Sequence, residues 1–145
     1  MPTARKFFTE DQQEDLRLAI MNAELNTSGE IRVHIENTCQ GEVMDRALVI
    51  FHKLEMHKTA NRNGVLIYLA AKNRKFAIIG DEGIHKIVPE NYWDSIKNRM
   101  LEHFRENRFT EGLVEAITET GRQLKKNFPY QVNDVNELPD EISFS

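Results

Sequence analysis

The stretch RNGVLIYLAAKNRKFAIIGDEG, residues 62–83, decides the fold of this chain. Its first part, VLIYLAA at 65–71, is continuously apolar, which is typical of a strand buried on both faces of a sheet. Lys72-Asn73-Arg74 predicts a short turn, and KFAIIG at 75–80 predicts a returning strand. Asp81-Glu82-Gly83 then ends that strand. We therefore expect a β-hairpin at the centre of the fold.

A strand and a helix precede this hairpin. The segment EIRVHIEN, residues 30–37, alternates apolar and polar residues, which predicts a half-buried strand. From about Glu42 to His57, apolar residues recur at helical spacing. A strand, a helix and a second strand form a βαβ unit, whose two strands are parallel when they share a sheet.

Three further helices complete the pattern, which gives four helices in chain order. The first of the four begins near Thr9, where Gln12 three residues later gives a capping-box signal. The third begins at about Glu90, and the fourth runs from Thr110 until Pro129 ends it. The order α-β-α-β-β-α-α predicts a layered α/β domain. No segment stands out as a further strand.

Length and composition restrict the class of protein. The chain has 145 residues, which suits one domain, and we assign residues 1–129 to it. Residues 130–145 are polar and acidic, and we expect a loosely attached tail. A net charge of −4 argues against nucleic-acid binding. Cys39 is the single cysteine, so the fold does not depend on disulfides.

The sequence contains neither an apolar leader at its start nor a run of about 20 apolar residues that could span a membrane. We therefore expect a cytoplasmic protein with no membrane span. We also expect a monomer, with an unknown protein as a candidate partner.

Polar residues gather where the topology brings three chain segments together. In the predicted sheet, the starts of the first two strands share one edge with the end of the third. Carboxylate and amide oxygens at that edge are the ligands that Ca²⁺ and Mg²⁺ prefer. The candidate ligands are Glu24, Glu30, Asn61, Asn63, Asp81 and Glu82.

A simpler interpretation stays open for the same residues. Asp81 can cap the turn that follows it, and the other side chains can be solvated. The sequence also offers no nucleophile for catalysis at this edge. Arg62 and Arg74 are candidate phosphate contacts, although an arginine in an exposed turn is usually only solvated.

Five features occur in order along the chain: TSGEIRVHIE (27–36), RNGVLIYLA (62–70), KFAIIGDEGI (75–84), Trp93 and FTEGLVEAI (109–117). Together they resemble the TPM domain family, and the resemblance covers roughly residues 8–129. It implies a three-layer αβα sandwich around a small mixed sheet of about four strands. It also implies a divalent cation, most often Ca²⁺, near two crossing loops, and acid phosphatase activity has been proposed for plant members.

The resemblance extends to single residues. Asp81 stands in the family's Gly-Asp-x-Gly-Ile loop, which makes it the strongest ligand candidate. Asn61 and Asn63 fall in the partner crossing loop, and Glu30 matches the Gly-Glu start of the first strand. Glu82 falls at a position that looks more variable in the family.

Three functions follow from these observations. The first is a metal-binding domain in which Ca²⁺ or Mg²⁺ orders two loops, 58–63 and 80–85, and so regulates contact with a partner. The alternative is a metal-dependent acid phosphatase, which rests on family analogy. A third is an interaction module that uses the acidic segment 133–145.

Overall fold

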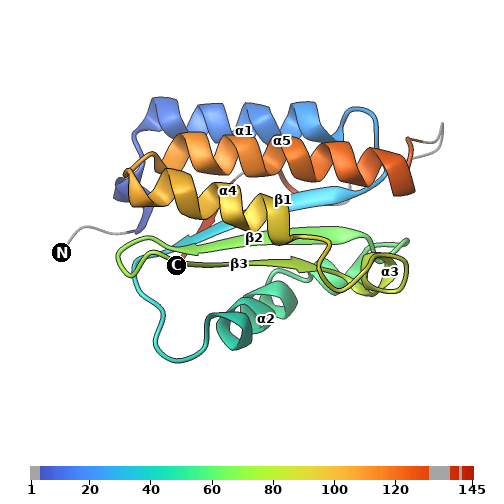
Figure 1. Cartoon of the computed structure of the whole chain (residues 1–145), viewed down its shortest axis with the longest axis horizontal. Helices are drawn as coiled ribbons and strands as arrows, with labels where there is room; N and C mark the ends of the chain where they lie inside the picture. The colour runs from blue at the N-terminus through green and yellow to red at the C-terminus, as the bar shows by residue number, and fades with distance from the viewer. Residues whose placement is uncertain (1–3, 131–137, 141) are drawn as a thin grey trace.

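The computed structural model describes residues 4–130, 138–140 and 142–145. A mixed sheet of four strands forms the middle layer. Helices α1, α4 and α5 cover one face of this sheet and α2 covers the other (Figure 1). The expected three-layer αβα sandwich with a small mixed sheet is confirmed.

The elements follow one another nearly as the sequence predicts. Among the described residues they are η1 (Ala4–Phe7), α1 (Glu10–Glu24), β1 (Glu30–Glu36), α2 (Val43–Lys53), η2 (Met56–Lys58), β2 (Gly64–Ala70), β3 (Lys75–Gly80), α3 (Glu82–His85), α4 (Asp94–Arg105), α5 (Phe109–Asn127) and β4 (Ser143–Phe144).

The sheet has the strand order β3-β2-β1-β4. β1 and β2 pair in parallel with Glu30 opposite Gly64, which confirms the βαβ unit. β2 and β3 pair antiparallel with Val65 opposite Gly80, which confirms the hairpin. The starts of β1 and β2 therefore share one edge with the end of β3, as the sequence predicts.

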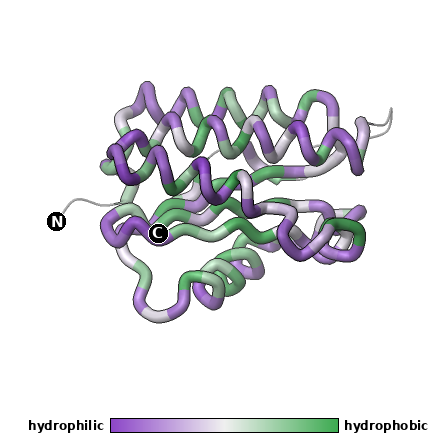
Figure 2. Tube along the Cα trace, in the orientation of Figure 1, coloured by the Kyte–Doolittle hydropathy of each residue, from purple (hydrophilic) through white to green (hydrophobic). Residues whose placement is uncertain are grey.

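Hydrophobic packing explains why the sheet is the middle layer. All seven residues of β2 are buried, as expected for a central strand covered on both faces. One core cluster joins the sheet to α1, α4 and α5, and a second joins it to α2. In Figure 2 the central strands are largely green, whereas the helices alternate between green and purple. The helices thus bury one face and present the other to water.

The expectation that β1 is half-buried is wrong. Its polar residues His34 and Glu36 are only 3% and 5% exposed. Arg46 from α2 and the hydroxyls of Ser143 and Ser145 contact these side chains, so their polar atoms are satisfied inside the fold.

The fourth strand comes from the segment expected to be a loose tail. Ser143 and Phe144 form β4, which pairs in parallel with His34 and Ile35 of β1. Leu138 is only 8% exposed and joins the core cluster under α2. The structure thus differs from the expectation for 138–140 and 142–145, while 131–137 and 141 lie outside the described residues.

Some helix boundaries also differ from the sequence prediction. The second helix ends at Lys53, and Glu55 takes a left-handed conformation with φ 59° before η2 begins. The third predicted helix begins at Asp94 instead of about Glu90. A short helix, α3, follows Asp81 directly and was not predicted. None of the helices in the described part of the chain is long and apolar enough to cross a membrane.

Candidate functional site

Two loops cross at the edge where β1 and β2 begin and β3 ends. The amide of Gly83 donates to the carbonyl oxygen of Arg62 at 2.8 Å, and the amide of Asp81 donates to that of Gly64 at 2.9 Å. A Cβ on Gly83 would lie 2.4 Å from the carbonyl oxygen of Asn61 and 2.6 Å from that of Arg62. Glycine at position 83 therefore allows the two backbones to touch.

An ion pair joins the crossing loops. Nε and Nη2 of Arg62 donate to the two carboxylate oxygens of Asp81 at 2.8 and 2.9 Å. Nη1 of Arg62 also lies 3.4 Å from the carboxylate of Glu82. The hydrogen bonds to Asp81 raise the pKa of the Arg62 guanidinium. The Asp81 side chain is only 5% exposed, but that of Arg62 is 42% exposed, so one partner is fixed and the other borders water.

Asp81 also begins helix α3. Its Oδ1 accepts a hydrogen bond from the amide of Glu82 at 2.7 Å, so Asp81 caps the turn that follows it. The simpler interpretation from the sequence is therefore confirmed for Asp81. The cap uses only Oδ1 of Asp81, and both carboxylate oxygens also accept hydrogen bonds from Arg62.

The backbone of Arg62 is strained at the crossing. Its φ is 50°, in the left-handed region that residues with a Cβ seldom adopt. Such strain persists only where neighbouring contacts hold it, and it is common at functional sites. Here the amide of Gly83 and the carboxylate of Asp81 hold Arg62 in place.

Two other candidate ligands are used inside the fold. Asn63 is 1% exposed, and its side-chain amide donates to Oγ of Ser28 at 3.3 Å. Glu30 is 3% exposed, and its carboxylate accepts a hydrogen bond from the amide of Leu138 at 2.6 Å. Neither side chain is solvated, contrary to the simpler interpretation.

Glu24 belongs to the group around Glu30. It accepts a hydrogen bond from the amide of Ile31 at 2.8 Å and forms a second with the carboxyl group of Asp140. Burial, and then the bond to Asp140, raise the pKa of Glu24 to about 10. Glu24 is thus protonated at neutral pH, which disfavours it as a metal ligand there.

The structure separates the six candidates into two groups. Asn61, Asp81 and Glu82 lie at the loop crossing, whereas Glu24, Glu30 and Asn63 line the start of β1. Among the described residues, no three His, Cys, Asp or Glu side chains are arranged to hold a metal ion. The sequence prediction also missed Arg62 as the partner of Asp81, although opposite charges on two loops expected to cross were a usable signal.

A second polar cluster lies at the opposite end of β1, and we call it the β1-end cluster. Its centre is the carboxylate of Glu36, which accepts hydrogen bonds from Arg46, from the phenol of Tyr68 and from Ser145. Burial alone would raise the pKa of Glu36, but these bonds outweigh it and lower the pKa to about 2. The cluster consists of His34, Glu36, Arg46, Tyr68, Ser143 and Ser145.

His34 links the C-terminal segment to this cluster. Its Nδ1 lies 2.7 Å from Oγ of Ser143, and its Nε2 lies 2.7 Å from Oγ of Ser145. Burial lowers the pKa of His34 to about 4, so the imidazole is neutral at pH 7. Short contacts from the two serine side chains thus hold β4 against β1.

The fold and the loop crossing define the class of protein: a small αβα domain with polar crossing loops at one edge of a mixed sheet. The sequence profile of the TPM domain matches residues 3–123, and the chain belongs to this family. The resemblance seen in the sequence is therefore confirmed. No curated protein is significantly similar to the chain in sequence.

Solved structures agree with this assignment. The NMR structure of the BA42 protein from the psychrophilic bacterium Bizionia argentinensis is 43% identical, covers 96% of each chain and has a TM-score of 0.90. The N-terminal domain of a P. gingivalis protein is 21% identical over 83% of this chain and 78% of that one, with a TM-score of 0.69. The N-terminal domain of cg2496 from Corynebacterium glutamicum is 11% identical over 90% and 81%, with a TM-score of 0.66. The last two share the fold.

The loop crossing offers a donor set that suits the divalent cation implied by the resemblance, on one condition. The carboxylates of Asp81 and Glu82 and the backbone carbonyl of Asn61 supply oxygen atoms near the crossing, which hard cations prefer. The guanidinium of Arg62 occupies both oxygens of Asp81 in this structure. The positive charge of this guanidinium repels a cation at the same carboxylate, so the residues fit a metal best when Arg62 moves away.

Proposed function

We propose that this domain binds a divalent cation, Ca²⁺ or Mg²⁺, at the loop crossing. Asp81 is the principal ligand, and Glu82 and Asn61 supply further oxygen atoms. Arg62 is the internal counter-ion that holds the site when no metal is bound. The supporting observation is the asymmetry of the Arg62–Asp81 pair, because the carboxylate is buried and the guanidinium is half-exposed.

This asymmetry favours exchange of the positive charge. Asp81 cannot leave the crossing, since its amide is bonded to Gly64 and its carboxylate caps α3. Arg62 borders water, so its guanidinium regains hydration when a cation replaces it on Asp81. The +2 charge of a bound cation would then face the carboxylates of Asp81 and Glu82. In this structure both carboxylates pair with Arg62, and Glu82 also pairs with Lys86 at 3.2 Å.

Exchange would also give the domain two states. With Arg62 on Asp81, the guanidinium is occupied; with a cation in its place, the guanidinium is presented to solvent beside the loop crossing. A ligand shifts the population toward the state that it binds better. Binding of a partner to that surface would thus depend on the cation, which is the regulatory role expected from the sequence.

An NMR titration tests this proposal. We expect Ca²⁺ or Mg²⁺, added to about 10 mM, to shift the amide signals of residues 58–63 and 80–85, a range that covers weak oxygen-ligand sites. Asp81→Asn should lose these shifts. Glu42→Gln, which removes an exposed acid at the start of α2, should keep them. Unchanged spectra, or equal shifts in Asp81→Asn, would overturn the proposal.

Metal-dependent phosphatase activity is the alternative function that the resemblance implies. One observation favours it: an Arg62 released from Asp81 would be a half-exposed cation beside the metal, where a phosphate could bind. Hydrolysis of p-nitrophenyl phosphate with added Ca²⁺ or Mg²⁺ tests it. Activity that disappears in Asp81→Ala supports the alternative, and activity at background, or equal in the variant, argues against it.

A further inference from the structure

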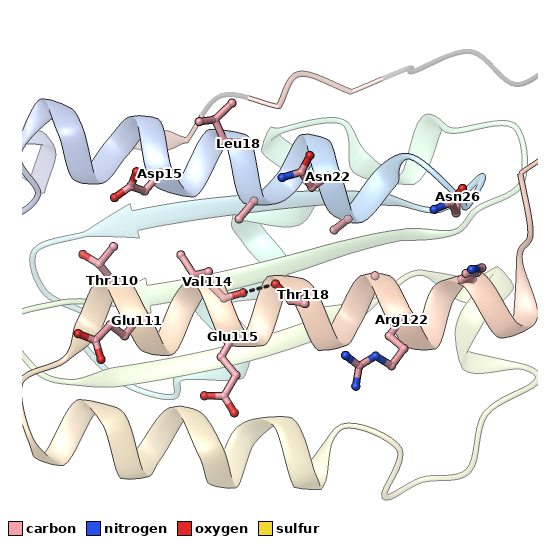
Figure 3. Close-up of a pocket in the computed structure, with 14 residues that line it drawn as sticks. Asp15, Leu18, Asn22, Asn26, Thr110, Glu111, Val114, Glu115, Thr118 and Arg122 are labelled. Carbon is pink, nitrogen blue, oxygen red and sulfur yellow. Dashed lines mark hydrogen bonds between the residues drawn. The ribbon is translucent and has the colours of Figure 1, made fainter.

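A groove of about 790 Å³ runs between α1 and α5 on the outer face of the helical layer (Figure 3). Its floor is made of small side chains, including Ala19, Ala23 and Gly121. A Cβ on Gly121 would lie 2.6 Å from the Cβ of Ala23, so the two helices touch beneath the groove. The groove lies over this contact between the two helices.

Charges of opposite sign lie at the two ends of this groove. α1 and α5 run in the same direction, with Asp15 and Glu111 at one end and Arg122 at the other (Figure 3). Lys125 lies one turn beyond, at the same end as Arg122. Glu111 and Arg122 have partners within the chain, at 3.5 and 2.7 Å.

Asp15 and Lys125 differ from these neighbours. Both are exposed, and neither forms an ion pair with any residue that the structure describes. The two charges lie on different helices and at opposite ends of the groove. They cannot neutralise one another within one chain, but they can do so between two chains.

An apolar ridge lies beside the groove on α1. Leu18, Met21 and Leu25 are 43%, 40% and 66% exposed, which is high for large apolar side chains on a helix that packs against a core. Their spacing of three and four residues places them along one side of α1. Leu18 belongs to both features, because it also lines the groove.

We propose, in contrast to the monomer expected from the sequence, that this face binds a second copy of the chain. In this arrangement α1 of each protomer lies antiparallel in the α1–α5 groove of the other. A two-fold interface needs a surface that is complementary to itself, and this face carries both a groove and a ridge. The antiparallel arrangement places Asp15 of one protomer near Lys125 of its partner, and the reverse pair forms by symmetry.

Length and dipole direction support the same arrangement. From Asp15 to Leu25 a helix rises by about 15 Å, and from Thr110 to Lys125 by about 22 Å, so α1 fits within the groove. α1 and α5 run in the same direction, and their aligned dipoles favour a neighbouring helix that runs the opposite way. Because the proposed contact is formed by two helices of each protomer, we expect a weak dimer with a dissociation constant of about 100 μM.

Sedimentation equilibrium tests the proposal, from about 10 μM to about 1 mM protein at low salt, a range that brackets the expected constant. The buffer contains EDTA, so the outcome is independent of cation binding at the loop crossing. We expect Lys125→Glu and Asp15→Lys each to weaken association by about tenfold, since two symmetric pairs become repulsive at once. The double variant Asp15→Lys/Lys125→Glu should restore it.

Lys126→Glu is the matched control. It makes the same change of charge at the next residue, which is also exposed but does not line the groove, and we expect association as in the wild type. A wild-type protein that stays monomeric at about 1 mM would overturn the proposal. So would equal weakening by Lys125→Glu and Lys126→Glu, or a double variant that remains as weak as the single ones. Circular dichroism of each variant serves as the control for correct folding.

Discussion

Two buried carboxylates in this domain are each paired with a half-exposed arginine, at opposite ends of the sheet. The Glu36 side chain is 7% exposed and that of its partner Arg46 is 38% exposed, while Asp81 and Arg62 are 5% and 42% exposed. The pairs differ in what else holds the carboxylate. Hydroxyl groups of Tyr68 and Ser145 also donate to Glu36, whereas among the described residues Asp81 has only the amide of Glu82 in addition.

This difference separates a structural ion pair from an exchangeable one. The carboxylate of Glu36 is surrounded by donors from β2, α2 and the C-terminal segment, so it holds three parts of the fold together. The carboxylate of Asp81 pairs with Arg62, and Arg62 in turn lies near the carboxylate of Glu82. An incoming cation would find two acids at the loop crossing but a single acid, already satisfied, in the β1-end cluster.

The largest expected effect is on the structural pair. Arg46→Gln should lower the free energy of unfolding by about 3 kcal/mol, because it leaves Glu36 buried without its counter-ion. Urea unfolding measures this change. Added Ca²⁺ should not restore the loss. A loss below about 1 kcal/mol would mean that the hydroxyl donors alone satisfy the carboxylate.

The contact between the two crossing loops can be disrupted without changing a charged residue. Gly83→Ala should lower the free energy of unfolding by about 2 kcal/mol, because the new Cβ overlaps the carbonyl oxygens of Asn61 and Arg62. Gly64→Ala is the control, since its Cβ would lie at an ordinary 3.5 Å from Met56. We also expect Gly83→Ala to weaken the NMR response to Ca²⁺. Equal stability of the two variants would show that the loops do not need this contact.

The exchangeable pair should behave differently from the structural one. Arg62→Gln should lower the free energy of unfolding by about 2 kcal/mol in EDTA, since among the described residues the buried carboxylate of Asp81 then keeps only the amide of Glu82 as a donor. Ca²⁺ at saturating concentration should return the loss. Thermal unfolding with and without Ca²⁺ measures both values. If Ca²⁺ stabilises Arg46→Gln as much as Arg62→Gln, the distinction between the two pairs is wrong.

The two ends of β1 should also respond to pH in opposite directions. The pKa of Glu24 rises from 4.5 to about 10 on folding, so its contribution is fully present below pH 4.5 and declines as the pH rises towards 10. The pKa of His34 falls from 6.5 to about 4, so its contribution is present above pH 6.5 and declines as the pH falls towards 4.

Unfolding free energies measured against pH in Glu24→Gln and His34→Asn separate these effects. Relative to the wild type, Glu24→Gln should remove the decline on the alkaline side, and His34→Asn should remove the decline on the acid side. Curves parallel to that of the wild type would mean that neither residue changes its proton affinity on folding. The comparison is made with the wild type because other groups titrate over the same range.

Much of the fold could be predicted because its signals are local. The apolar run at 65–71 and the helical spacing of apolar residues at 42–57 define the βαβ unit, and the turn at 72–74 defines the hairpin. β4 could not be predicted, since Ser143 and Phe144 form a two-residue strand in a polar segment and pair with β1 about 110 residues away. The burial of His34 and Glu36 depends on the same distant segment.

The sequence predicted where in the fold the candidate site lies better than it predicted which side chains contact one another. Topology alone brings Asn61, Asp81 and Glu82 to one edge, because strand direction decides where loops meet. The separation of Glu24 and Glu30 from Asp81 depends on the C-terminal segment, which supplies the amide of Leu138 and the carboxyl of Asp140. No pattern within the sequence relates that segment to β1.

The most direct test of the central claim is the dissociation constant for Ca²⁺ of the wild type and of Arg62→Gln, measured by calorimetry at one ionic strength. If Arg62 occupies the metal position on Asp81, its removal should tighten binding by about tenfold, because the cation no longer competes with a fixed positive charge. Arg46→Gln should leave the constant unchanged. Equal or weaker binding in Arg62→Gln would contradict the claim that the two positive charges exchange on Asp81.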